Sequence, residues 1–197
     1  MVTPEASSEI GQQLFYGEGR KKHYKKAFPY LLEAAYAGDP HCQNLVGYCY
    51  DLGLGVEKDL NAAFYWYGYA ASNDDLEGLF NLAICYKNGK GVEVNHKKAF
   101  SLYKRGASLG DAYSQCNLGI AYLQGLGTKR NLTEGIKWLR KAAYKGDDKG
   151  QYNLGMAYRN GDEGVRKNIR YARIWLSKAA QQGHKQAAAE LLNLNRM

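Results

Sequence analysis

Four histidines and four cysteines are the side chains of this 197-residue sequence that could hold a metal or serve as catalytic bases and nucleophiles. A metal site or a nucleophilic site needs two or three such groups to converge, but the histidines here are scattered along the chain. The cysteines form no CxxC pair and no zinc-site spacing. The eight residues are His23, His41, His96, His184, Cys42, Cys49, Cys85 and Cys116. We therefore expect no catalytic residue, no metal, no cofactor and no enzymatic activity, with a hydrolase as the remote alternative.

Two short glycine motifs resemble parts of a phosphate-binding loop. Gly53 and Gly55 are separated by one residue, as are Gly89 and Gly91. A dinucleotide-binding fingerprint needs a third glycine and a preceding strand, and the sequence offers neither. Because such glycine pairs recur along the chain, they indicate turns between helices.

Glycines and tyrosines recur at intervals of 36 residues over almost the whole sequence. The recurring positions are Gly17, Gly53, Gly89, Gly125 and Gly161; Gly11, Gly47, Ala83, Gly119 and Gly155; and Tyr50, Tyr86, Tyr122 and Tyr158. A period of this length is typical of helical repeat proteins. We predict a repeat array over residues 5–185, with units 5–40, 41–76, 77–112, 113–148 and 149–185. A C-terminal capping helix and tail follow at residues 186–197.

Each unit is predicted to contain two helices. In the second unit the first helix runs from Gln43 to Asp51 and stops at Gly53, where glycine can adopt the left-handed conformation that closes a helix. The second helix begins after an N-cap residue in a shared register: His23, Asp59, Asn95, Asn131 and Asn168. Asn131 and Glu134 resemble a capping box. The apolar face of the second helix is spaced i, i+3, i+4, i+7 and i+8 in the second unit: Ala63, Trp66, Tyr67, Ala70 and Ala71.

These units resemble the Sel1-like repeat family, a relative of the tetratricopeptide repeat. The matching text includes NLVGYCYDLGLGVEKDLNAAFYWYGYAA in the second unit and NLGIAYLQGLGTKRNLTEGIKWLRKAA in the fourth. The resemblance implies an all-α, right-handed α-solenoid of five helix-turn-helix repeats whose first helices line a concave face. It also implies an adaptor or scaffold that binds other proteins. Ala83 and Asp74 stand where the family pattern has glycine.

The composition is that of a globular protein, with 45% apolar and 23% charged residues and a net charge of +8. No signal peptide and no 18-residue apolar run is visible, so we expect a cytoplasmic protein that does not enter a membrane. Cys42 and Cys49 lie seven residues apart on one helix, ~10 Å apart and beyond the reach of a disulfide. We therefore expect free thiols, and we expect a monomer.

Many basic residues lie on or beside the predicted second helices. They are Arg20, Lys21, Lys22, Lys25 and Lys26; Lys97, Lys98, Lys104 and Arg105; and Lys137, Arg140, Lys141 and Lys145. Acidic residues are interspersed, which favours a solvated outer face. Binding of nucleic acid or an acidic partner through this face is the alternative.

The candidate site is a stripe of side chains at fixed offsets from the first-helix glycines, on the expected concave face. Its apolar members are Tyr48, Phe80, Ile84, Tyr113, Ile120, Leu123, Tyr152 and Met156, and its charged members are Asp51, Lys87 and Arg159. Exposed apolar patches mark interaction surfaces, and aromatic residues are typical anchors. We therefore predict a non-enzymatic scaffold that binds a peptide or protein along this face, with the charged residues orienting it. Two questions stay open: whether the stripe is instead buried as ordinary core, and whether the partner is a toxin, a signalling protein or another protein.

Overall fold

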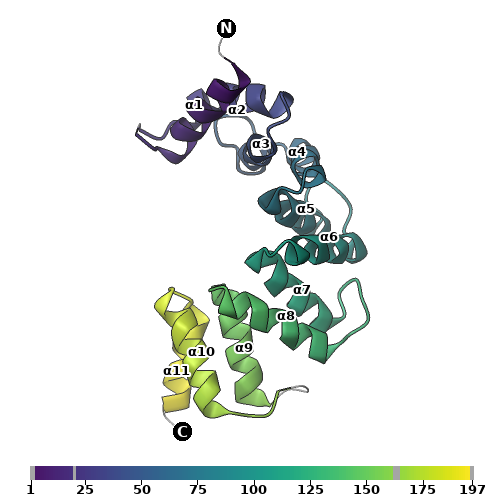
Figure 1. Cartoon of the computed structure of the whole chain (residues 1–197), viewed down its shortest axis with the longest axis vertical. Helices are drawn as coiled ribbons and strands as arrows, with labels where there is room; N and C mark the ends of the chain where they lie inside the picture. The colour runs from purple at the N-terminus through teal and green to yellow at the C-terminus, as the bar shows by residue number, and fades with distance from the viewer. Residues whose placement is uncertain (1–2, 20, 162–164, 196–197) are drawn as a thin grey trace. The chain divides into compact units, whose positions relative to one another are not determined.

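The computed structural model describes residues 3–19, 21–161 and 165–195, and over these residues the chain is all-α, with eleven helices (Figure 1). Their bounds are α1 (Pro4–Tyr16), α2 (Tyr24–Tyr36), α3 (Pro40–Leu52), α4 (Leu60–Ser72), α5 (Leu76–Asn88), α6 (His96–Ser108), α7 (Ala112–Gln124), α8 (Leu132–Tyr144), α9 (Asp148–Asn160), α10 (Ile169–Gln181) and α11 (Lys185–Asn195). Ten helices form the first and second members of five repeats. The eleventh follows the last repeat, where the sequence predicts a capping helix.

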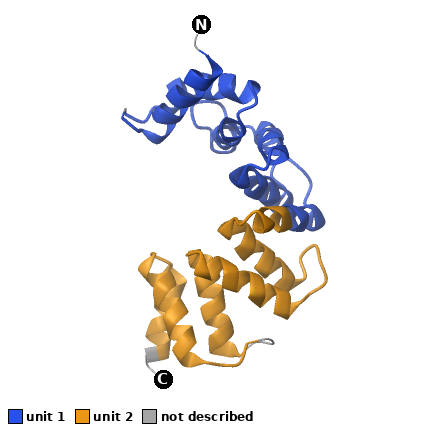
Figure 2. Cartoon of the chain, in the orientation of Figure 1, with its two compact units in different colours: residues 1–102 blue, residues 103–197 orange. Residues whose placement is uncertain are grey.

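The helices form two compact units, residues 1–102 and 103–197 (Figure 2). In unit 1, α1 packs against α2, α2 against α3, α3 against α4 and α4 against α5. In unit 2, the same holds from α7 to α11, so that α10 lies between α9 and α11 (Figure 1). None of the helices in the described parts of the chain is long and apolar enough to cross a membrane.

The first helix of each repeat ends at a glycine in the left-handed conformation, as the sequence predicts. Gly53, for example, has φ 72°, and its amide donates to the carbonyl of Cys49. The second helices also end near residues with positive φ. At this position the second repeat carries Asp74, the one departure from glycine, and it too is left-handed at φ 59°. The backbone path is therefore kept even where the side chain makes it less favourable.

The second helices begin at the predicted N-caps. Asp59 Oδ1 accepts hydrogen bonds from the amides of Asn61 and Ala62, at 2.9 and 3.0 Å. Asn131 Oδ1 accepts from the amide of Glu134, at 3.0 Å. The capping box expected at Asn131 is incomplete, because the Asn131 amide donates to the carbonyl of Tyr122 instead. In each repeat the N-cap amide donates a hydrogen bond to a carbonyl near the end of the preceding helix.

The first helices begin earlier than the sequence analysis predicts. Helix α3 starts at Pro40 rather than Gln43, and its N-cap Asp39 accepts a hydrogen bond from the amide of Cys42 at 3.0 Å. Asp75, Asp111 and Asp147 cap α5, α7 and α9 in the same way. These aspartates recur every 36 residues, so the N-cap signal of the first helices is present in the sequence.

Glycines within the first helices allow close packing against the second helices. A Cβ atom on Gly119 would lie 2.8 Å from Leu139 Cγ and 2.9 Å from the Gly135 carbonyl oxygen. The predicted apolar face of the second helix is also confirmed: Ala63, Tyr67, Ala70 and Ala71 are buried in α4. Trp66, in the same stripe, is only partly buried.

Replacing Gly119 with alanine should lower the free energy of unfolding by about 1–3 kcal/mol, because its Cβ would overlap the backbone of α8. Gly68 is the matched control, since it lies inside α4 and an added Cβ would meet no atom within 4 Å. Gly68→Ala should raise stability by up to about 1 kcal/mol through helix propensity. Urea denaturation followed by circular dichroism measures both. A Gly119→Ala protein as stable as the parent would contradict the close-packing interpretation.

Candidate partner-binding surface

The eleven predicted site residues all lie on first helices, but they divide between the two compact units. Unit 1 contains Tyr48, Asp51, Phe80, Ile84 and Lys87, on α3 and α5. Unit 2 contains Tyr113, Ile120, Leu123, Tyr152, Met156 and Arg159, on α7 and α9. Each set is therefore treated as a surface of its own unit. We call the two sets the first-helix faces.

In unit 1, the clearest exposed apolar residue of the first-helix face is Tyr48. Its side chain is 40% exposed, and its ring meets the edge of Phe15 at a centroid distance of 6.1 Å. Phe80, Ile84 and Lys87 are half-buried on α5. The Tyr48 ring thus contacts Phe15 on one side, and the rest of the side chain is open to solvent.

In unit 2, Tyr113 is 60% exposed at the start of α7. The other apolar members of the face are half-buried and support the core. Ile120 and Leu123 pack against the buried cluster that includes Leu139. Tyr152 and Met156 pack against a second cluster, and Tyr152 also stacks on His184 at a centroid distance of 4.5 Å. Part of the predicted stripe therefore serves packing, and Tyr113 is its most exposed member in this unit.

Two of the three charged residues on the faces are engaged within the chain. Asp51 accepts two hydrogen bonds from Lys90 Nζ, at 2.8 and 3.0 Å. Arg159 forms an ion pair with Glu190, which lies on α11. The first pair joins the second repeat to the third, and the second pair joins the last repeat to α11. A partner that used Asp51 or Arg159 would have to share or displace these contacts.

A buried asparagine also links the first helices of unit 1. Asn44 is almost fully buried, and its Nδ2 donates to Glu77 at 2.8 Å. Its Oδ1 accepts from Asn81 Nδ2 at 2.9 Å. The partners lie 33 and 37 residues away along the chain, so no local sequence signal predicts this network.

The four cysteines are free and buried, as expected. Burial raises the pKa of Cys42 to about 11, of Cys49 to about 12 and of Cys85 to about 11. Burial also raises the pKa of Cys116. A thiol is nucleophilic only as the thiolate, so these groups are poor nucleophiles at neutral pH. Within the described residues, no three His, Cys, Asp or Glu side chains are grouped so that they could hold a metal ion.

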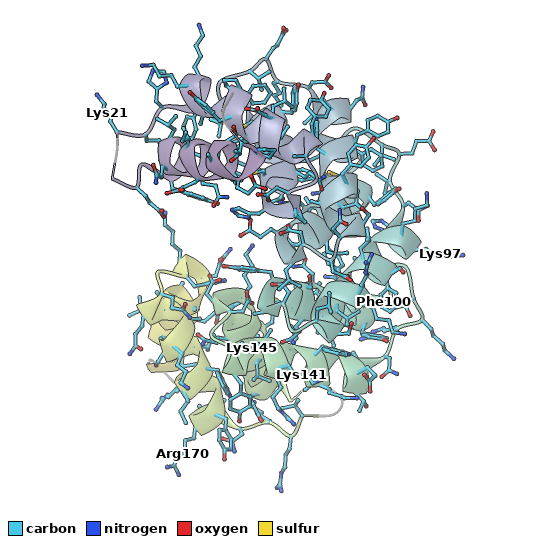
Figure 3. The ribbon with its side chains drawn as sticks, turned by 45° about the horizontal axis from the view of Figure 1, so that its top comes forward. Lys21, Lys97, Phe100, Lys141, Lys145 and Arg170 are labelled. Atoms are coloured by element: carbon cyan, nitrogen blue, oxygen red, sulfur yellow. The ribbon has the colours of Figure 1, made fainter. Side chains whose placement is uncertain are left out.

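The basic residues are unevenly divided between the units. Residues 1–102 contain 10 Lys and Arg and 12 Asp and Glu, a net charge of −2, whereas residues 103–197 contain 17 and 7, a net charge of +10. In unit 2, four basic residues line a pocket of about 600 Å³ beside Tyr144: Lys137, Arg140, Lys141 and Lys145. Lys141 and Lys145 are labelled in Figure 3, where Lys21, Lys97 and Arg170 point away from the ribbon. Arg20, from the predicted N-terminal cluster, lies outside the described residues.

Helix pairs of equal length, capped at the same positions and repeated every 36 residues, define a helical repeat protein. A Sel1 repeat model matches residues 4–39, 40–75, 76–111, 112–147 and 148–184. The chain therefore belongs to the Sel1 repeat family. Repeats of this family typically mediate protein interactions and are generally non-catalytic.

Solved structures share this fold closely. A Sel1 repeat protein from Oxalobacter formigenes is 32% identical, with a TM-score of 0.89 over 96% of this chain and 77% of that chain. The c5321 protein, a protective antigen present in uropathogenic Escherichia coli strains, is 31% identical, with a TM-score of 0.85 over 95% of this chain and 40% of that chain. Among curated proteins, 62 residues are 37% identical to the chitin synthase regulator SKT5 of Saccharomyces cerevisiae. That match covers 32% of this chain and 9% of the regulator.

The buried thiols should be almost unreactive in the folded protein. At pH 8 an aromatic disulfide reagent should modify none of the four cysteines within minutes, because thiols with raised pKa values stay protonated until the pH approaches 11. The reagent should modify all four after denaturation in guanidinium chloride. Absorbance of the released thiolate measures both reactions. Rapid modification of a native cysteine at pH 8 would show that the thiol is exposed or its pKa is not raised.

Proposed function

We propose that the protein is a non-enzymatic scaffold that binds a peptide or protein partner through its first-helix faces. The observation that supports this most directly is the exposure of Tyr48 and Tyr113 on those faces. Neighbouring members of the same stripe are packed into the core, so these two tyrosines are aromatic groups that the fold itself does not bury. Tyrosine offers a large, stiff apolar surface with a polar tip and is common among interface hot spots.

The first-helix faces suit a partner that brings its own apolar side chains. The ring of Tyr48 is held from one side by Phe15, which lowers the conformational entropy lost when a partner covers the other side. Lys87 lies on the same face of unit 1 and is half-buried. We assign affinity to the tyrosines and place Asp51 and Arg159 in a supporting role, because both already form ion pairs.

A photo-crosslinking amino acid placed at Tyr48 or Tyr113 should capture the same partner from native extract. Tyr171 is the matched control, because it is 50% exposed but lies on a second helix, α10. The Tyr48→Ala/Tyr113→Ala protein should bind the partner at least tenfold more weakly, with unchanged helical content, because exposed side chains contribute little to folding. Titration against the isolated partner measures this loss. Equal capture from Tyr171, or unchanged affinity in the double variant, would contradict the first-helix faces as the binding site.

A second candidate is binding of an acidic protein segment to the basic pocket of unit 2. It is favoured by the net charge of +10 and by the four basic residues around that pocket. Complementary charge accelerates association and fixes orientation.

A glutamate-rich peptide should bind the protein at low salt, and the affinity should fall steeply as the salt concentration rises. Lys137→Ala/Arg140→Ala should weaken binding at least fivefold, whereas the control Lys21→Ala/Lys97→Ala, in unit 1, should not. Fluorescence anisotropy at two ionic strengths measures both effects. Stronger binding of a single-stranded DNA of equal charge, lost in the same double variant, would assign this surface to nucleic acid instead.

A further inference from the structure

A pocket of about 460 Å³ in unit 1 is walled by aromatic rings. It lies among α2, α3 and α4, and its rings are Tyr36, Tyr65, Trp66 and Tyr69. The three tyrosines are 75%, 64% and 57% exposed. Trp66 contacts the rings of Tyr36 and Tyr69 edge to face, at centroid distances of 5.2 and 5.6 Å. We call this group the aromatic pocket.

Gln43 also lines the aromatic pocket and is 7% exposed. Its Nε2 donates to the carbonyl of Ala35 at 3.1 Å. Its Oε1 is buried and accepts no hydrogen bond from the described part of the chain. A buried acceptor without a donor is unfavourable, so a ligand N–H that reached this oxygen would be stabilising.

Unit 2 contains the same arrangement, with a lysine beside the tryptophan ring and a donor on the glutamine oxygen. Tyr144 meets Trp175 edge to face at 5.1 Å, in the register of Tyr36 and Trp66. Lys178 Nζ lies 4.7 Å from the centre of the Trp175 ring. The counterpart of Gln43 is Gln151, whose Oε1 accepts a hydrogen bond from Gln182 Nε2 at 2.9 Å. The chain thus supplies its own cation to the tryptophan and its own donor to the glutamine.

The fourth repeat has the lysine over its tryptophan but not the donor, because Gln115 Oε1 accepts no hydrogen bond from the described residues. Lys141 Nζ lies 4.1 Å from the centre of the Trp138 ring, again from three residues further along the helix. In the second repeat the corresponding positions are Tyr69 and Asn73 rather than a lysine and a glutamine. The Asn73 side chain donates to the carbonyl of Tyr69, at 3.2 Å. Among the described residues, none therefore places a lysine over the Trp66 ring or a donor on the glutamine oxygen.

We propose that the aromatic pocket binds an arginine side chain of a partner protein. A guanidinium group stacks on aromatic rings as a cation and carries N–H donors, so one group can replace both the lysine and the glutamine donor seen in unit 2. The lining includes no lysine or arginine, and unit 1 has a net charge of −2, so a cation meets no basic neighbour in the pocket. This site combines rings of the second helices with Gln43 of α3, and its lining includes none of the residues of the first-helix faces.

The indole N–H signals of the three tryptophans in a ¹H–¹⁵N spectrum report on this site. Titration with acetyl-Gly-Ser-Arg-Ser-Gly-amide should shift the Trp66 signal in a saturable way and leave Trp138 and Trp175 unchanged, because those rings already carry lysines. The citrulline peptide keeps the N–H donors but lacks the charge, and should bind at least fivefold more weakly. Equal shifts with citrulline, or equal shifts at Trp175, would overturn the proposal. Free arginine that binds tenfold more tightly than the peptide would assign the pocket to a small molecule and also overturn it.

Tyr69→Lys should place the chain's own ammonium over Trp66, as Lys178 is placed over Trp175, and should weaken arginine-peptide binding at least tenfold. Lysine is a good helix former, so helical content should be kept. Tyr171→Ala removes an exposed tyrosine from unit 2 and should leave binding unchanged. Tyr65→Ala provides a second test if Tyr69→Lys folds poorly, with a loss of at least threefold expected. A folded Tyr69→Lys protein, or a folded Tyr65→Ala protein, with the parent's affinity would overturn the proposal.

Discussion

The close contact between the two helices of a repeat is the constraint on which the rest of the structure depends. At Gly47, Gly119 and Gly155 an added Cβ would come within 3 Å of a Tyr67, Leu139 or Leu176 side-chain atom. The missing side chain lets the large residue of the second helix lie directly against the first helix. A glycine inside a helix costs about 1 kcal/mol relative to alanine, and this packing offsets the cost. Because the contact recurs in four repeats, with Ala83 at this position in the third, the repeats share one register, and chemistry can change at other positions without moving the helices.

The sequence predicts most of this architecture because its signals are local. Left-handed glycines, Asn and Asp caps and the apolar stripe each act within one helix or turn, and the 36-residue period repeats them. The candidate site was harder to predict. Asp51 and Arg159 sit where the sequence places them, but their partners Lys90 and Glu190 come from beyond their own helices. Likewise, Ile120 and Tyr152 satisfy the same spacing rule as Tyr113, yet they pack against buried clusters. Spacing along the sequence predicts the direction in which a side chain leaves its helix. Whether that side chain is exposed to solvent depends on the packing of the neighbouring helices.

In the buried glutamines, the amide nitrogen makes the same bond in each repeat, whereas the partner of the amide oxygen varies. Gln43, Gln115 and Gln151 each donate to the carbonyl of an alanine eight residues earlier, at 3.1, 3.3 and 3.2 Å. Each of these carbonyls, near the end of the preceding second helix, also accepts the amide of the glycine three residues later, so the glutamine adds a second hydrogen bond there. The oxygen of each amide faces a more variable environment. The oxygen of Gln151 accepts a hydrogen bond from Gln182, whereas the oxygens of Gln43 and Gln115 accept none from the part of the chain that the structure describes. The bond of the amide nitrogen near the helix end is therefore kept in all three repeats, while the partner of the amide oxygen differs.

The same reasoning explains why the second helices carry both stabilising and recognition groups. A tryptophan at the register of Trp66, Trp138 and Trp175 has an exposed π-face unless something covers it. A lysine three residues later covers that face at low cost, because i and i+3 side chains are neighbours on a helix. Replacing that lysine with tyrosine, as at Tyr69, removes the internal cation and adds another electron-rich ring. This difference changes the lining of the pocket at this register from basic to aromatic, while the glycine contact beneath it keeps the helices in place. Because the stabilising contacts and the variable positions lie at different registers of the same helix, repeats of this kind can diverge in what they bind and still keep one fold.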